Sequence, residues 1–285
     1  MIDSILTIIT FTVLGIASVT DMRSREVPDW VSYAFIAVAA GVRVLAAIRL
    51  WSISPIIEGA AGFAIFFVIG YAIYRAGQWG GGDAKLMMGV GTAIGLQWNT
   101  FPTLAIFFVA MLLAGALWGL GWMIVLGIHH RNRVWEEIKQ KKNKRYIQGG
   151  IVFIILSIVL AVISPSEIRL EIIALLCLAL LVMLLLPLIK AVEKVALIKS
   201  IAPQQLTEGD WLAEPVVING KKIVDAIYSG VTKKDMKTLI ELHDKGKLNR
   251  VIIKNGIAFV PSFLMGYTIT VIAGEKIATT IALLL

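Results

Sequence analysis

The sequence predicts an all-α polytopic integral membrane protein with about eight spans and a small cytoplasmic α+β module. The composition is the first indication, because the 285 residues are 58% hydrophobic, only 16% charged and have a mean hydropathy of +0.83, far from the averages of soluble domains. Apolar stretches of about 20 residues, the length that a helix needs to cross a bilayer, recur along the chain. A long polar stretch separates the last two of them.

Each apolar stretch is a candidate membrane-crossing helix. They are residues 5–20, 31–47, 56–74, 84–96, 101–128, 149–163, 168–189 and 259–273. The fourth is short and rich in glycine, so whether it crosses the membrane fully stays open at this stage. The N-terminus lacks the basic segment and the cleavage site of a secretory signal, which predicts a retained first span.

The charges of the loops set the orientation, because Lys and Arg in short loops favour the cytoplasmic side. Residues 129–148, "HHRNRVWEEIKQKKNKRYIQ", contain seven Lys or Arg and are therefore placed in the cytoplasm. Counting spans backward from this loop puts residues 75–83 and 21–29 on the same cytoplasmic face. Counting forward puts residues 190–258 there too. We therefore expect a multi-pass protein of the cell membrane.

The polar stretch predicts a small α+β module. Residues 214–226, "EPVVINGKKIVDA", alternate like a hairpin with a turn near Asn219 and Gly220. A helix follows, opened by Thr232 and Asp235 as a capping box and closed by Gly246. The segment "LNRVIIKNGIAFVP" adds a strand before the last span. Nothing in this module suggests catalysis.

The expected organisation has five parts. They are a membrane core (1–128), a basic cytoplasmic loop (129–148), an additional transmembrane hairpin (149–189), the soluble cytoplasmic module (190–258) and a C-terminal transmembrane segment (259–285).

Composition also excludes several classes of protein. Cys177 is the only cysteine and lies in an apolar run, so the chain can build neither a disulfide framework nor a multi-cysteine zinc site. The net charge of +8 lies in loops beside apolar spans, which is typical of charges that set topology. We therefore expect membrane lipid around the chain and no nucleic acid as a partner. The oligomeric state stays open.

The first apolar stretch ends in "GIASVTDMRSREVPDW", where Asp21 lies near the negative end of a helix dipole. A carboxylate is disfavoured there, so its presence needs a reason. One interpretation is structural: Asp21 lies at the membrane interface, and Arg23 and Arg25 neutralise it. The other is functional, because ionisable residues at membrane depth are functional candidates by default.

Asp83 follows Gly80 to Gly82 in "GQWGGGDAKLMMGVG". As a structural residue it would be the N-cap of a helix starting at Ala84, with Lys85 as a local counter-charge. The glycines favour another interpretation, because they permit positive φ and let a backbone open or approach another segment closely. Non-helical backbone at membrane depth survives only inside protein or beside a wet cavity. We therefore expect a polar pocket entered from the cytoplasm.

Asp21 and Asp83 together would form a defined chemical unit. Two carboxyl groups held a few ångströms apart cannot both ionise cheaply, so one keeps a proton and the other stays a base. Such a pair can activate a water molecule with one carboxylate and polarise a peptide carbonyl with the other. This chemistry requires no metal and no cofactor, and we expect none.

These residues also carry a resemblance. Gly80 to Asp83 form a Gly-x-Gly-Asp motif, and "TDMRSREVPDW" has the form Asp-x-Arg-x-x-x-Val-Pro-Asp after a first span. Together they resemble the type IV prepilin peptidases, most closely the archaeal preflagellin and prepilin peptidases. The similarity extends through the fifth span and resumes at "GIAFVPSFLMGYTITVIAG", about two thirds of the chain.

The resemblance implies an intramembrane aspartyl endopeptidase. It would cleave the signal segment of archaellin or type IV pilin precursors, next to a basic residue and a glycine, at the cytoplasmic membrane border. Asp21 and Asp83 would be the catalytic pair, and Gly80 and Gly82 the motif glycines of an active-site loop that includes Gly81. On electrostatic grounds alone, the acidic residues Glu26 and Asp29 are candidates for attracting the substrate's basic residue.

Other interpretations stay open. Bacterial relatives often carry a cysteine-rich zinc site and an N-methyltransferase activity, and this chain has no such cysteines. Presenilin and signal-peptide-peptidase homologues share Gly-x-Gly-Asp but usually have a tyrosine before the first aspartate, where this chain has Thr20, and a late Pro-Ala-Leu motif, where it has "FVPSF". A proton-coupled transporter could use both aspartates as a relay, although they lie near one face rather than at the midplane. The choice between archaellin and pilin also stays open.

Overall fold

The computed structural model describes residues 2–96, 103–139, 149, 152–157, 159–160, 162, 165, 169–218, 220–226 and 230–284. The chain divides into two compact units. The first, called the core unit below, comprises residues 1–120, 202–251 and 256–285. The second unit comprises residues 121–201 and 252–255. Each is described by itself.

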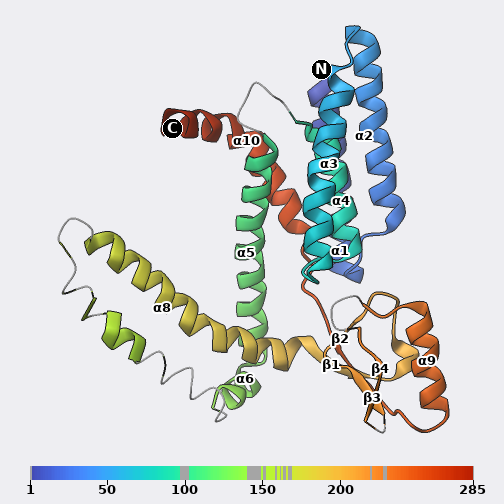
Figure 1. Cartoon of the computed structure of the whole chain (residues 1–285), viewed down its shortest axis with the longest axis vertical. Helices are drawn as coiled ribbons and strands as arrows, with labels where there is room; N and C mark the ends of the chain where they lie inside the picture. Colours follow the sequence, from blue (N-terminus) through green and yellow to red (C-terminus); the bar gives the residue numbers. More distant parts are fainter. Residues whose placement is uncertain are drawn as a thin grey trace. The chain divides into compact units, whose positions relative to one another are not determined.

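Helices dominate the structure (Figure 1). The helices that correspond to the first five expected spans and to the last one are α1 (Ile2–Ser24), α2 (Asp29–Leu50), α3 (Ser54–Arg75), α4 (Gly81–Ile94), α5 (Thr103–His129) and α10 (Pro261–Leu284). All begin within a few residues of the expected spans, and all except α10 also end within a few residues of them; α10 continues to Leu284, beyond the expected end at residue 273. Their polar connections, such as the turn between α1 and α2, match the breaks that the sequence predicts.

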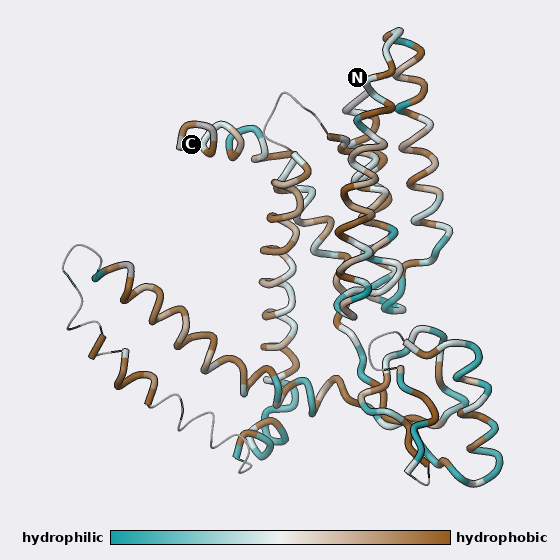
Figure 2. The backbone as a smooth tube through the Cα atoms, in the orientation of Figure 1, coloured by the Kyte–Doolittle hydropathy of each residue, from teal (hydrophilic) through white to brown (hydrophobic). Residues whose placement is uncertain are grey.

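Five helical segments among the described residues are long and apolar enough to cross a membrane. They are Ser4–Ser24, Asp29–Leu50, Ser54–Arg75, Thr103–His129 and Ile172–Leu197, and Figure 2 shows the hydrophobic colouring of these helices. The chain is thus a multi-pass membrane protein. The fourth expected span, α4, has 14 residues and a length of about 21 Å, shorter than a bilayer core. Of the sixth, residues 149–163, the structure describes residues 149, 152–157, 159–160 and 162, all of them helical.

Glycines hold α4 in close contact with α2 and α3. A Cβ atom at Gly62 of α3 would collide with the backbone carbonyl of Gly91 on α4, and one at Gly89 would collide with the ring of Phe35 on α2. Small residues at such positions let helix backbones approach closely, which drives helix packing where no water is displaced. Gly62 and Gly91 therefore pack against each other within the chain.

A buried arginine fixes the C-terminal end of α4. The guanidinium of Arg43, which is only 6% exposed, donates to the backbone carbonyls of Thr92 at 2.6 Å, Ala93 at 3.0 Å and Pro55 at 3.0 Å. It also lies 3.5 Å from the carboxylate of Glu58. The last carbonyls of a helix have no partner within the helix, so Arg43 satisfies groups that would otherwise be orphaned.

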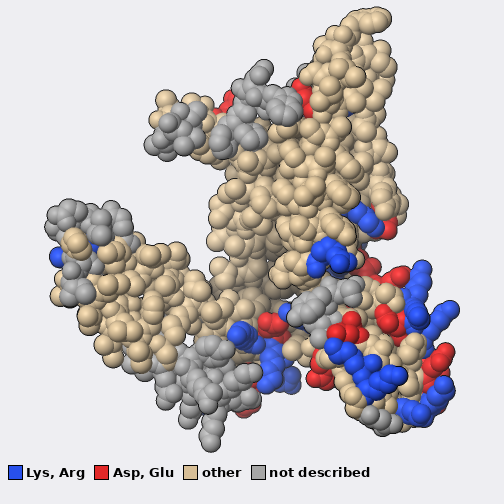
Figure 3. Space-filling view, in the orientation of Figure 1, with Lys and Arg blue, Asp and Glu red and all other residues tan. Residues whose placement is uncertain are grey.

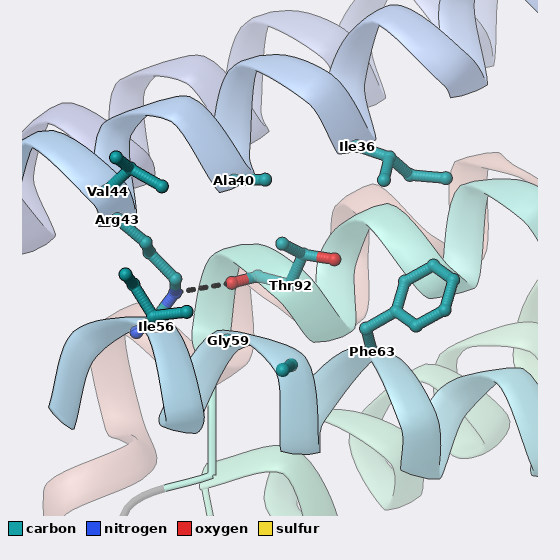
Figure 4. Close-up of a pocket in the computed structure, with 9 residues that line it drawn as sticks. Ile36, Ala40, Arg43, Val44, Ile56, Gly59, Phe63 and Thr92 are labelled. Carbon is teal, nitrogen blue, oxygen red and sulfur yellow. Dashed lines mark hydrogen bonds between the residues drawn. The ribbon is translucent and has the colours of Figure 1, made fainter. Parts of the chain in front are cut away.

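An apolar cavity of about 270 Å³ lies beside this arginine. Figure 4 shows side chains of α2, α3 and α4 around it. Its lining residues are Ile36, Ala40, Arg43, Val44, Ile56, Gly59, Ala60, Phe63 and Thr92.

The main hydrophobic core lies among α1, α2, α3, α4, α5 and α10. Its largest fully buried side chains include Phe35, Phe66, Phe107 and Phe263. At Gly266 of α10, a Cβ atom would lie only 2.6 Å from the Cα of Met111, so α10 packs directly on the backbone of α5. This core positions α1, α4 and the start of α10 with respect to one another.

The core unit also contains most of the polar module. Strands β3 (Val216–Ile218) and β4 (Lys221–Val224) pair antiparallel, with Ile218 opposite Lys221, which confirms the predicted hairpin. The residue Asn219 of its turn lies outside the described residues, while Gly220 adopts a φ of +76°. Short elements precede the hairpin, namely the 3-10 turn η2 (Pro203–Gln205) and β2 (Trp211–Leu212).

Helix α9 (Lys233–Asp244) follows the hairpin and begins as the sequence predicts. The backbone N–H of Thr232 donates to Asp235 at 3.0 Å, and the backbone N–H of Asp235 donates to the Thr232 hydroxyl at 3.2 Å. The predicted capping box is therefore confirmed. Gly246 ends the helix with a φ of +67°. Figure 3 shows charged side chains gathered over this module, whereas the faces of the long helices carry few.

The second unit holds α6 (Arg131–Ile138), α8 (Arg169–Val192), the π-helical turn η1 (Glu193–Leu197), β1 (Ile198–Ile201) and most of β5 (Val251–Lys254). β1 and β5 are neighbours in one sheet. Val134 of α6 packs with Ala191 and Val192 of α8, and Lys194 forms an ion pair of 2.6 Å with Glu137.

We predict that Arg43→Met lowers the free energy of unfolding by roughly 3 kcal/mol, because the carbonyls at the end of α4 and the Glu58 carboxylate lose their partner. Thermal unfolding in detergent measures this. Arg75→Met, at an exposed arginine of α3, is the matched control and should leave the midpoint unchanged. Equal midpoints for the two variants would contradict the assigned role of Arg43.

Candidate active site

Asp21 lies in the last turn of α1 and is 5% exposed. One of its carboxylate oxygens, Oδ2, accepts a hydrogen bond of 2.8 Å from the backbone N–H of Val260. The guanidinium of Arg25 contributes a favourable charge from the turn that follows. Asp21 is therefore a buried carboxylate that is stabilised by a group 239 residues away, rather than a solvated charge at the membrane surface.

Asp83 lies in the first turn of α4. The helix begins at Gly81 and its N-cap is Gly80, so the expectation of a helix starting at Ala84 with Asp83 as its N-cap was wrong. Asp83 occupies the third position of the helix instead, and its Oδ2 accepts a hydrogen bond of 3.1 Å from the backbone N–H of Gly80. A carboxylate in this position is favoured by the helix dipole.

The structure brings the two aspartates within electrostatic reach of each other. Burial, and secondly the negative charge of Asp21, raise the pKa of Asp83 to about 7. The hydrogen bond from Gly80 acts in the opposite direction, but it does not offset them. A carboxyl group that keeps its proton near neutral pH beside a second carboxylate has the properties of an acid–base pair.

Of the three glycines before Asp83, Gly82 acts through close packing. Gly80 has a φ of −71° and Gly81 and Gly82 are helical, so none of the three uses the positive φ that the sequence suggested; the nearby Gly77 does, at +67°. A Cβ atom at Gly82 would lie 3.2 Å from the backbone oxygen of Val27. The glycine thus lets α4 begin directly against the turn between α1 and α2.

A short extended segment completes the surroundings of Asp21. Residues Gly256–Val260, called the strap below, precede α10 and carry the N–H group that Asp21 accepts. The guanidinium of Arg25 donates to the carbonyl of Gly256 at 2.6 Å, and the indole N–H of Trp118 donates to the carbonyl of Ala258 at 2.8 Å. The strap is therefore fixed at three points.

An aromatic cluster joins the strap to the segment before Asp83. The ring of Trp79, which is 6% exposed, lies 5.7 Å from that of Phe259 and 5.6 Å from that of Phe263. Aromatic pairs at such distances contribute about 1 kcal/mol beyond their burial. The residue just before the Gly-x-Gly-Asp motif thus packs on the segment that holds Asp21.

Comparison with known proteins identifies this arrangement. Residues 8–120 match the model of the type IV leader peptidase family. This part of the chain, called the leader peptidase domain below, is therefore similar to that family. It contains α1 to α4 and most of α5, and with them both Asp21 and Asp83.

The chain is also similar to curated preflagellin peptidases of three archaea. It is 39% identical over 82 residues to that of Methanococcus maripaludis, a match that covers 28% of this chain and 35% of the relative. Identity is 33% over 81 residues for Methanococcus voltae and 32% over 81 residues for Methanocaldococcus jannaschii, each match covering 28% of this chain and 34% of the relative. The matches therefore span about a third of the length of these relatives.

The acidic residues of the turn between α1 and α2 have different surroundings. Asp29 forms an ion pair of 2.6 Å with Lys85, whose ammonium also lies 5.1 Å from the centre of the Tyr33 ring. Lys85 is therefore the partner of Asp29, and the suggestion that it is the local counter-charge of Asp83 was wrong.

Glu26 is exposed and lies near Glu208 and Asp210 of the polar module. Partial burial, and then the charges of Asp210 and Glu208, raise the pKa of Glu26. The sequence gave no signal for these two neighbours, because they follow Glu26 by more than 180 residues. Among the residues that the structure describes, no group of three or more His, Cys, Asp or Glu is placed to hold a metal ion.

We predict that the carboxyl group of Asp83 titrates near pH 7 in the folded protein and that Asp21→Asn lowers this pKa, because the substitution removes the neighbouring negative charge. Infrared difference spectra of the protonated carboxyl band, compared with those of Asp83→Asn, measure it. An unchanged pKa in Asp21→Asn would show that the two groups do not interact.

Proposed function

We propose that the chain is an intramembrane aspartyl endopeptidase that cleaves the signal segment of archaellin or type IV pilin precursors at the cytoplasmic border of the membrane. The observation that carries this proposal is the proximity of Asp21 and Asp83 within a leader peptidase domain. The similarity to preflagellin peptidases supports the class of substrate. It also favours this function over a presenilin-like protease or a proton-coupled transporter.

Asp83 acts as the acid and Asp21 as the base in the first step. The pKa of about 7 keeps the proton on Asp83 near neutral pH, while the N–H of Val260 is aimed at an ionised Asp21. Asp21 takes a proton from a water molecule whose oxygen attacks the peptide carbonyl carbon, and Asp83 donates its proton to the carbonyl oxygen. The product of this step is a tetrahedral gem-diol, and the negative charge has moved to Asp83.

The second step breaks the peptide bond. Asp21 transfers its new proton to the amide nitrogen, the C–N bond breaks, and one hydroxyl of the gem-diol returns a proton to Asp83. The released products are a carboxylic acid and an amine, and the pair regains its starting protonation. Both steps use only protons that the two carboxyl groups and the water supply.

The proposed topology has about eight spans, with residues 129–148 and the polar module in the cytoplasm. The seven Lys and Arg of residues 129–148 support it. In this orientation the ends of α1 and α3 and the start of α4 face the cytoplasm, where the basic segment of a precursor would arrive. The exposed Glu26 is then a better candidate than Asp29 for attracting that segment, because the ion pair between Asp29 and Lys85 would first have to break.

We predict that Asp21→Asn and Asp83→Asn each abolish cleavage of a precursor in detergent and that the double variant loses no more activity, because either loss already destroys the pair. Asp21→Glu should also be strongly impaired, since one methylene displaces the carboxylate. Asp244→Asn, on the exposed end of α9, is the matched control. Retained cleavage in Asp83→Asn would reduce Asp83 to a residue that stabilises the start of α4, where the amide oxygen of Asn can accept the same hydrogen bond from Gly80.

We further predict that chelators and thiol reagents leave cleavage unchanged. The mechanism uses two carboxyl groups, and the exposed Cys177 lies in α8, outside the leader peptidase domain. The measurement is the rate of cleavage after EDTA treatment and dialysis, and separately after maleimide labelling. Inactivation by EDTA that zinc reverses would contradict a two-aspartate mechanism.

A further inference from the structure

Helix α5 contacts the strap directly. Trp118, near the middle of α5, donates its indole N–H to the carbonyl of Ala258, two residues before the Val260 N–H that is donated to Asp21. Three residues earlier on the same helix, Gly115 lies against Phe259 of the strap. Residues three apart share one face of a helix. One face of α5 therefore supplies both a hydrogen bond and a matching surface to the strap.

We propose that Trp118 is a positioning residue for the reaction, which holds the strap so that the N–H of Val260 stays aimed at the carboxylate of Asp21. This inference rests on the function proposed above, because it assigns Asp21 the part of the base. Trp118 itself does not touch the reacting atoms. It acts on them through two hydrogen bonds and the two peptide units between Ala258 and Val260.

The strap needs such a hold because it has no regular secondary structure. Ala258 is 9% exposed, so its carbonyl would lack a partner without the indole N–H, at a cost of about 1–3 kcal/mol. The hydrogen bond from Arg25 to Gly256 fixes the other end of the strap, but it lies two residues farther from Val260. Closer to Val260, the Ser262 hydroxyl of α10 donates to the carbonyl of Phe259 at 2.6 Å, so Trp118 is the side chain that anchors the strap to a different helix, α5.

Gly115 provides a second contact of a different kind. A Cβ atom at this position would lie 2.5 Å from Cε2 of Phe259 and 3.4 Å from the Cβ of Ser262. Gly115→Ala would therefore push the Phe259 ring, and with it the backbone next to Val260, away from α5. The strap can thus be displaced either by removing a hydrogen bond or by adding a methyl group, and both changes should affect Asp21 in the same way.

The decisive variant is Trp118→Phe, which removes the indole N–H and keeps an aromatic side chain. We expect kcat for precursor cleavage to fall about tenfold, the effect of roughly 1.4 kcal/mol in the transition state, while KM stays within twofold. We also expect hydrogen exchange of the backbone amides of residues 256–260, followed by mass spectrometry, to become faster. Trp51→Phe, at a 95% exposed tryptophan of the turn after α2, is the matched control and should change neither quantity.

The two readouts separate this proposal from the proposed function. Unchanged exchange of residues 256–260 in Trp118→Phe would overturn the role of Trp118, and so would a loss of kcat without faster exchange. If exchange becomes faster in Trp118→Phe but the wild-type protein cleaves no precursor, the role of Trp118 in holding the strap is supported. The absence of cleavage then contradicts the peptidase function. If Trp118→Phe does not fold, Gly115→Ala tests the same point: a lower kcat with faster exchange supports the proposal, and normal values for both overturn it.

Discussion

The structure depends on keeping two carboxyl groups together in a place where neither is fully solvated. Each receives one backbone N–H, that of Val260 for Asp21 and that of Gly80 for Asp83. A pair of ionised carboxylates would repel strongly in such surroundings, so one of them retains a proton. The pKa of Asp83 is raised for this reason. Much of the surrounding packing holds the N–H groups of Val260 and Gly80 in place.

The packing of α4 is the clearest consequence. Its glycines allow close contact with α2 and α3, and Arg43 satisfies its final carbonyls. A helix of 14 residues has little stability of its own, because short helices depend on tertiary contacts. If α4 rotated by a fraction of a turn, Asp83 would move away from Asp21. The contacts along the faces of α4 and at its C-terminal end prevent this rotation.

The sequence was sufficient for those features that depend on local patterns. The membrane class followed from the composition, the hairpin and the capping box of Thr232 from short-range signals, and the two aspartates from their places at the ends of apolar stretches. The start of α4 was misplaced because Gly81 and Gly82 are helical, although glycine is a weak helix former. The partner of Lys85 was misassigned because Asp29 is close to it in space and distant in the chain.

The contribution of the strap could not be predicted for a more basic reason. Val260 acts through its backbone N–H. Because almost every residue type has this group, the residue type at position 260 does not indicate the role. In the sequence, Trp118 and Gly115 are ordinary residues of an apolar helix. Only the structure shows that they contact Ala258 and Phe259. The only sequence signal was the return of the family resemblance at Gly256, which marked the segment as part of the core without indicating what it does.

In the proposed mechanism, the different surroundings of the two aspartates decide which of them starts as the acid. Asp83 experiences burial and the charge of Asp21, with one opposing hydrogen bond. Asp21 is buried too, which disfavours its charge, but it has a backbone donor and, in addition, the nearby guanidinium of Arg25, which also anchors the strap. One arginine thus favours the charge on Asp21 directly and secures the segment that donates to it. Since a single proton has to be shared, an advantage to the ionised form of Asp21 places that proton on Asp83, where it lies ready for the carbonyl oxygen of a peptide.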